Sequence, residues 1–142
     1  MKKDHDKAIK ICKRRNELLK RIHKITKGQL QAVNENRIDD YLQSFDERQR
    51  HLKELIATEI DVKKFIEDHI EAPCAELASL EASARETFEK ICAIEPEIEK
   101  RVKLRLREVK GEVGNIRKAR TTVKAYHTRT TSKRGREINK QG

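Results

Sequence analysis

The side chains that could do chemistry are scattered along this 142-residue chain. Five histidines are present, and no two have the His-x-x-x-His spacing that would place two imidazoles on one helix face for a metal. They are His5, His23, His51, His69 and His127. Three cysteines (Cys12, Cys74 and Cys92) are an odd number with wide gaps and no Cys-x-x-Cys pair. The pattern predicts neither a disulfide framework nor a zinc site, and the cysteines are interpreted as small hydrophobic residues.

Motifs for phosphate or acyl chemistry are also missing from the sequence. There is no phosphate-binding loop, no dinucleotide fingerprint and no nucleophile elbow. Glu95, Glu97 and Glu99 cluster around Pro96, which stabilisation of a helix N-terminus explains better than a metal site. We therefore expect no catalytic residues, no metal and no cofactor, and a protein that binds a partner and is not an enzyme.

One enzyme class resembles part of the chain closely enough to be weighed. Arg37, the Asp39-Asp40 pair and Arg48 partly resemble the first helix of helical chorismate mutases, where basic side chains hold two carboxylates. In that family an arginine comes three residues before the Ile-Asp pair, and Glu35 stands there in this chain. The mismatch argues against this class.

Composition indicates long helices that would position any binding surface. Charged residues make up 41% of the chain, against two prolines and no tryptophan. No stretch is long and apolar enough for a membrane span, and the basic N-terminus lacks the apolar core of a signal peptide. We expect a cytoplasmic protein that does not enter a membrane.

Apolar residues at helical spacing predict four helices, over residues 6–33, 37–71, 74–93 and 97–127. Asn36 is the expected N-cap of the second helix, whose apolar stripe includes Ile38, Leu42, Ile56 and Ile60. Pro96 is expected to kink or break the chain between the last two helices. The expected fold is an all-α antiparallel bundle of three long helices and one shorter helix over residues 1–127. A disordered basic tail would follow over residues 128–142.

Charge is divided along the chain in a way that suits neighbouring antiparallel helices. Residues 1–34 have a net charge of +8, residues 35–99 of −10 and residues 100–142 of +12. The basic last segment also fits a nucleic-acid-binding protein with salt-dependent affinity. Tyr126 is its only aromatic residue for stacking on a base, and no known nucleic-acid-binding fold is apparent, so nucleic acid is the less favoured partner.

The most informative amphipathic pattern lies in the segment from Ile98 to Tyr126. Its apolar residues recur at steps of three, four and seven, and the opposite face is almost wholly charged. The candidate partner-binding residues on this stripe are Val102, Leu106, Val109, Val113, Ile116, Val123 and Tyr126. The alternative for each of them is a place in the core of the bundle.

Two stretches of the chain resemble the flagellar type III export chaperones, specifically the filament-cap chaperone (FliT-type) family. The first runs from Leu18-Leu19 through Arg37-Ile38-Asp39-Asp40-Tyr41-Leu42 to Leu55, and the second from Ile98 to Lys124-Ala125-Tyr126. In that family a helix, a polar elbow and a second helix are similarly followed by a long amphipathic helix that ends near Ala-Tyr. Here His127 follows the tyrosine, where the family usually has glycine.

The resemblance implies a small cytoplasmic chaperone for flagellum assembly by type III secretion. It would hold the amphipathic C-terminal segment of the filament-cap protein and keep it soluble until export. Export ATPase components and a flagellar transcription regulator are further partners that the family implies. The hook-filament junction chaperones (FlgN-type) share this architecture and remain the main alternative.

Overall fold

The computed structural model describes residues 2–130 of the chain, and side chains as far as Lys124. Within that range the fold is all-α, as predicted, with helices α1 (Lys2–Asn34), α2 (Ile38–His69) and α3 (Ala75–Thr130). The chain divides into two compact units, Met1–Arg101 and Val102–Gly142, and α3 has residues in both.

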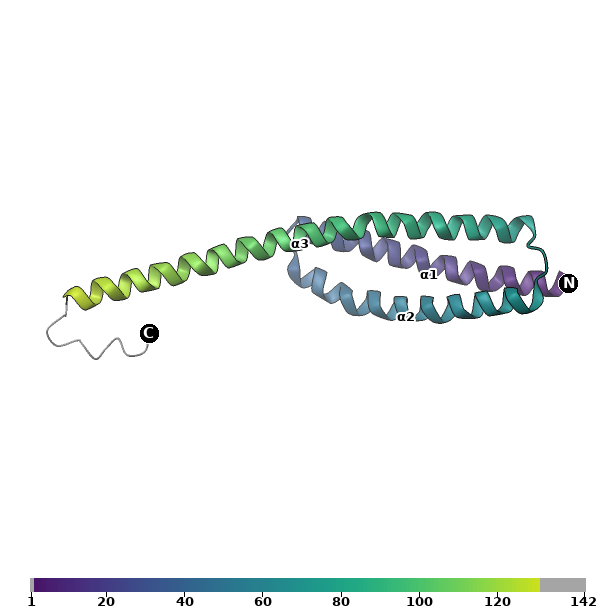
Figure 1. The fold of residues 1–142 in the computed structure, drawn as a ribbon, viewed down its shortest axis with the longest axis horizontal. Helices are drawn as coiled ribbons and strands as arrows, with labels where there is room; N and C mark the ends of the chain where they lie inside the picture. The colour runs from purple at the N-terminus through teal and green to yellow at the C-terminus, as the bar shows by residue number, and fades with distance from the viewer. Residues whose placement is uncertain (1, 131–142) are drawn as a thin grey trace. The chain divides into compact units, whose positions relative to one another are not determined.

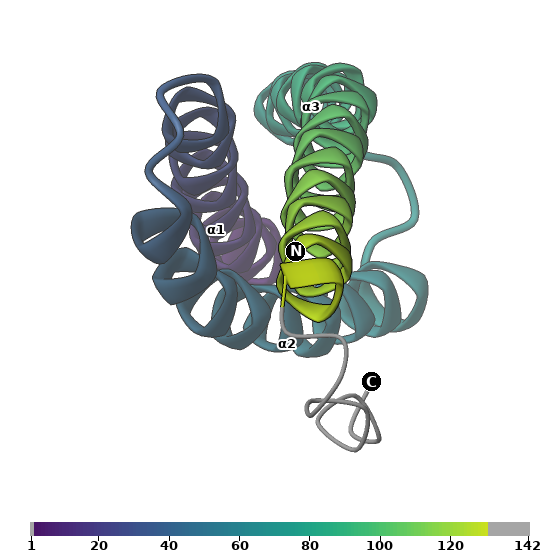
Figure 2. The ribbon, with the colours of Figure 1, turned by 90° about the vertical axis from the view of Figure 1, so that its left-hand side faces the viewer.

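The first unit is a bundle of α1, α2 and the part of α3 up to Arg101 (Figures 1 and 2). One core cluster joins Ala8 and Cys12 near the start of α1 to Val62 near the end of α2 and to Leu77 near the start of α3. A second cluster joins Ile22 further along α1 to Ala84 and Ile91 of α3. This order makes α1 and α2 antiparallel, while α1 and the first part of α3 run in the same direction.

The predicted count of four helices is wrong for the described residues, because the expected short and last helices form one helix. α3 continues through Pro96 without a break. Proline lacks the N–H that would bond to the carbonyl of Cys92, four residues earlier. Cys92 and Pro96 are both exposed, so water can hydrate that carbonyl. Ile91 and Ile98 are buried on either side of Pro96 and favour continuation of the helix.

Asn36 ends α1 and does not cap α2, which corrects the sequence-based assignment. Its φ is 58°, in the left-handed region that asparagine tolerates better than most residues. The Arg37 N–H donates to the Ala32 carbonyl (2.7 Å) and the Asn36 N–H to the Val33 carbonyl (3.2 Å). These two bonds form a Schellman motif. Arg37 takes the N-cap position of α2 without a side-chain capping bond.

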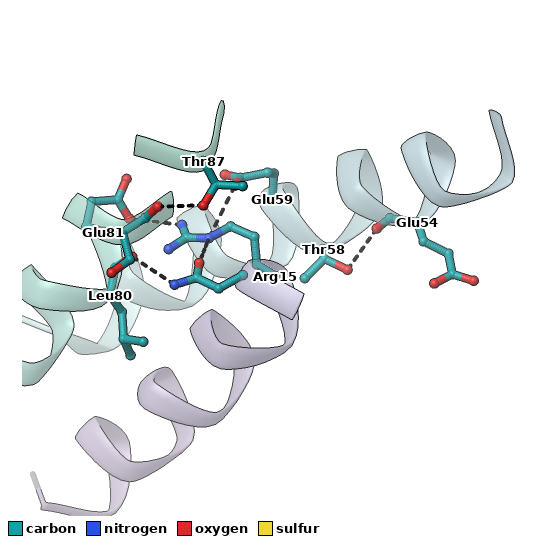
Figure 3. A network of polar contacts seen from close by, with 9 residues as sticks. Arg15, Glu54, Thr58, Glu59, Leu80, Glu81 and Thr87 are labelled. Carbon is teal, nitrogen blue, oxygen red and sulfur yellow. Dashed lines mark hydrogen bonds and ion pairs between the residues drawn. The ribbon is translucent and has the colours of Figure 1, made fainter. Parts of the chain in front are cut away.

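A buried arginine connects the three helices of the first unit. Arg15 of α1 is only 1% exposed. Its Nη1 lies 2.9 Å from Glu81 Oε2 on α3, and its Nε lies 3.5 Å from Glu59 Oε1 on α2 (Figure 3). The neighbouring Asn16 donates from Nδ2 to the Leu80 carbonyl at 2.9 Å. Arg15 interrupts the apolar stripe of α1, and two carboxylates from other helices compensate its charge.

The expected division into a helical domain, residues 1–127, and a disordered basic tail, residues 128–142, stays a prediction. α3 is described as far as Thr130. Residues 131–142, which contain most of the expected tail, lie outside the described part of the chain.

Candidate partner-binding face

The second unit presents the apolar residues expected from the sequence along one helical segment of α3. We call Val102, Leu106, Val109, Val113, Ile116 and Val123 the α3 stripe. Steps of three, four and seven residues place them on one face of a helix. From Val102 to Val123 the stripe extends about 30 Å at 1.5 Å per residue.

Most of the α3 stripe is exposed. Leu106 is 55% and Val123 65% exposed, and Val109, Val113 and Ile116 also belong to the exposed large hydrophobic residues. Val102 is half-buried. These five residues belong to the second unit. The side chain of Tyr126, the seventh predicted residue, lies outside the described side chains.

Charged side chains surround the stripe. Arg105 Nη1 lies 3.1 Å from Glu108 Oε2 and 4.0 Å from Glu112 Oε1, so the segment has its own ion pairs along the helix. Such pairs between exposed side chains stabilise a helix by about 0.3–0.5 kcal/mol each. Charged side chains therefore flank an exposed apolar face.

A second exposed apolar row, on α2, was assigned to the core by the sequence reasoning. Ile38, Leu42, Ile56 and Ile60 are all exposed. Only Val62 of α2 is classed as buried, so α2 contributes a narrow face to the core. The stripe expected for α2 was wide enough to contain both faces, and periodicity alone did not show which face is buried.

The first unit also has an apolar groove of about 500 Å³. Cys12 of α1, Val62 and Ile66 of α2, and Pro73 and Leu77 at and after the connection to α3 line it. Burial raises the pKa of the Cys12 thiol, although the nearby Arg15 acts in the opposite direction. A thiol with a raised pKa is a weak nucleophile at neutral pH. The groove is therefore suited to apolar contact and poorly suited to nucleophilic chemistry.

Neither a metal-binding group nor a membrane-spanning helix is found among the described residues. No group of three His, Cys, Asp or Glu side chains among them could hold a metal ion. Nor does any helix in the described part have the length and apolarity needed to cross a membrane.

A comparison with protein families matches residues 16–128 to the family described as flagellar protein FliT. The match includes α2 completely, most of α1 and almost all of α3. The chain belongs to the FliT family. Comparisons with curated proteins and with solved structures gave no match. Membership confirms the family resemblance, and with it an assignment to flagellum assembly. All described residues of the α3 stripe lie inside the matched range of this FliT-family chain.

Proposed function

We propose that this FliT-family chain is a cytoplasmic flagellar export chaperone for the filament-cap protein. It binds the amphipathic C-terminal segment of that protein and keeps it soluble and competent for export. The observation that carries the proposal is the exposed α3 stripe in a chain of a flagellar family. An apolar face of this length is unusual on a soluble helix unless a partner covers it.

The α3 stripe suits recognition of an amphipathic helix. Such partners insert apolar anchors at steps of three and four residues, and Leu106, Val109, Val113 and Ile116 follow steps of the same size. Burying a large aliphatic side chain stabilises a complex by roughly 1.5–3 kcal/mol before the costs of association. A few anchors are therefore sufficient for micromolar affinity, and a client held this way can be released at the export apparatus. Export ATPase components and a flagellar transcription regulator are further proposed partners, implied by the family.

The test is calorimetric binding of the filament-cap protein's C-terminal segment to the full chain and to two matched double variants. Leu106→Ala/Ile116→Ala removes two anchors of the α3 stripe. Leu42→Ala/Ile60→Ala removes the same side-chain types from the exposed row of α2, where exposure is similar. We expect stoichiometric binding to the unmodified chain. The α3 variant should weaken it about tenfold or more, and the α2 variant should change it little.

The opposite ranking of the two variants would place the client on α2. No binding of the cap segment to the unmodified chain would refute the cap-protein assignment, and the hook-filament junction protein would be the next client to test. Binding of nucleic acid with a steep loss of affinity at physiological salt would favour the alternative of a nucleic-acid-binding protein.

A further inference from the structure

The α3 stripe follows a heptad repeat. From Val102 the steps are four, three, four, three, four and three, through Leu106, Val109, Val113, Ile116, Arg120 and Val123. A step of four followed by a step of three is the alternation of coiled-coil d and a positions. Val102, Val109, Ile116 and Val123 therefore occupy d positions, and Leu106, Val113 and Arg120 occupy a positions. Three consecutive heptads fit without an insertion.

The repeat gives the two flanks of the stripe different charges. The four e positions are all basic and exposed, and we call them the basic flank: Lys103, Lys110, Arg117 and Lys124. The three g positions hold Arg105, Glu112 and Ala119, so their formal charges cancel. In a coiled coil the e and g side chains lie beside the partner's e and g side chains and select the partner by charge. The basic flank therefore favours carboxylates on the partner helix.

A second copy of this chain does not match that preference. In an antiparallel pair of copies, e positions meet e positions, so the basic flank would face itself. In a parallel pair, Arg105 would face Lys110 of the other copy, and the two Arg120 side chains would meet at one a layer. The repeat favours a partner of different sequence.

Arg120 can fix how the partner helix is aligned along the α3 stripe. It is exposed and occupies the a position between Ile116 and Val123. A charged residue at one a position is tolerated where the facing residue is polar or of opposite charge, and this fixes the alignment of the two helices. The partner is therefore expected to interrupt its own apolar seam with an acidic residue opposite Arg120.

We propose that the α3 stripe forms a two-stranded coiled coil with one acidic amphipathic helix, whose carboxylates lie against the basic flank and opposite Arg120. This inference rests on the proposed function in placing the partner on the α3 stripe, and it specifies the partner's chemistry. The observations that carry it are the unbroken heptads, the four cations on one flank and the exposure of the apolar positions.

The test uses two synthetic helical peptides of about four heptads with the same apolar a and d residues. One has Glu at every e and g position, so that it suits either orientation, and its twin has Lys there. Binding of each peptide to the full 142-residue chain is measured by fluorescence anisotropy at low and physiological salt. The Glu peptide should bind about tenfold or more tightly than the Lys peptide, with the difference reduced by salt.

Charge reversal on the chain provides the matched control. Lys110→Glu/Arg117→Glu changes two positions of the basic flank, and Arg107→Glu/Lys118→Glu makes the same change in net charge at outward b and f positions. The first variant should lose or reverse the preference for the Glu peptide, and the second should retain it. Equal binding of the two peptides to the unmodified chain would overturn the proposal. So would an equal loss of preference in both variants, or tighter binding of a single-stranded oligonucleotide of similar charge than of the Glu peptide.

The cap protein's C-terminal segment is measured in parallel to separate this inference from the proposed function. If that segment binds and Lys110→Glu/Arg117→Glu has no effect on either ligand, the chaperone function stands and the acidic coiled-coil partner is refuted. If the Glu peptide binds with the expected preference and the cap segment does not, the inference stands and the client assignment fails.

Discussion

Arg15 on α1 and Glu81 on α3 form an ion pair of 2.9 Å in which the two partners differ greatly in exposure. The Arg15 side chain is 2% exposed and the Glu81 side chain 55%. Arg15 Nη2 is buried without a hydrogen-bond partner, and Glu59 lies further from the guanidinium than Glu81 does. The cation therefore depends on Glu81, while water can hydrate the carboxylate on its own.

This asymmetry predicts unequal effects of removing either partner. Glu81→Leu leaves a buried cation with one weak ion pair, to Glu59, and a hydrogen bond to Asn16. It should lower the free energy of unfolding by about 2 kcal/mol, less than for a fully buried pair because Glu81 is half-exposed. Arg15→Met removes the buried charge and should cost about 1 kcal/mol or less, through lost contacts. Urea unfolding monitored by circular dichroism measures both. A larger cost for Arg15→Met would contradict this account.

The left-handed conformation of Asn36 predicts a residue-specific effect at the end of α1. Asn36→Gly should leave stability unchanged or raise it slightly, because glycine adopts a positive φ without strain. Asn36→Val should lower stability by about 1–2 kcal/mol, because a β-branched side chain is strained there. Thermal unfolding of the two variants is the measurement. If Asn36 were instead an N-cap that bonds through its side chain, Gly and Val would both destabilise.

Pro96 inside α3 predicts a stabilising substitution. Pro96→Ala restores an N–H donor to the carbonyl of Cys92 and should raise the free energy of unfolding by about 1–2 kcal/mol. The gain is smaller than the full helix penalty of proline, because proline also restricts the unfolded chain. Denaturant unfolding gives the value, and Pro73→Ala, outside the helix, is the control. No gain at Pro96 would mean that Cys92 and its neighbours already compensate for the missing bond.

His23 on α1 predicts how stability depends on pH. Burial lowers the pKa of His23 below its usual value, and Lys27 and Lys90 act in the same direction. The folded protein therefore binds this proton less tightly than the unfolded chain does. The contribution of His23 to the free energy of unfolding is fully present above about pH 6.5, the usual pKa of histidine. It is lost as the pH falls through the pKa that His23 has in the folded protein. Unfolding midpoints at pH 7.5 and 5 should differ less in His23→Gln, and Lys90→Gln should reduce the difference partly.

Replacing Gly111 and Gly114 by alanine is predicted to strengthen partner binding, because the helical segment becomes more ordered. They occupy the outward f and b positions of the heptad repeat, and nothing lies within 4 Å of a Cβ added at either one. Gly111→Ala/Gly114→Ala should therefore stabilise this segment by about 1 kcal/mol per site without touching the α3 stripe. Helix content by circular dichroism should rise, and the cap segment should bind up to about tenfold more tightly. Gly28→Ala, in α1, is the control that should leave binding unchanged.

The helical fold and the position of the α3 stripe could be predicted from residue spacing, because periodicity reports directly which residues share a helix face. The continuation of α3 through Pro96 could not be predicted in this way, since the penalty of about 3 kcal/mol for proline inside a helix competes with burial of Ile91 and Ile98. Asparagine is favoured both at an N-cap and in a left-handed turn, so residue type alone left the role of Asn36 open. Exposure of Ile56 and Ile60 depends on how α2 packs, which spacing does not encode.

The uneven distribution of buried residues gives the first unit an expected order of opening. Eleven buried residues lie along α1, among them Ala8 near its start and Val33 near its end, whereas α2 has one. Side chains of α2 contact both core clusters, but release of α1 exposes more fully buried residues than release of α2 does. Backbone amides in the middle of α1 should therefore exchange with deuterium most slowly. Amides of α2 should exchange through a separate, lower-energy opening that leaves α1 paired with α3.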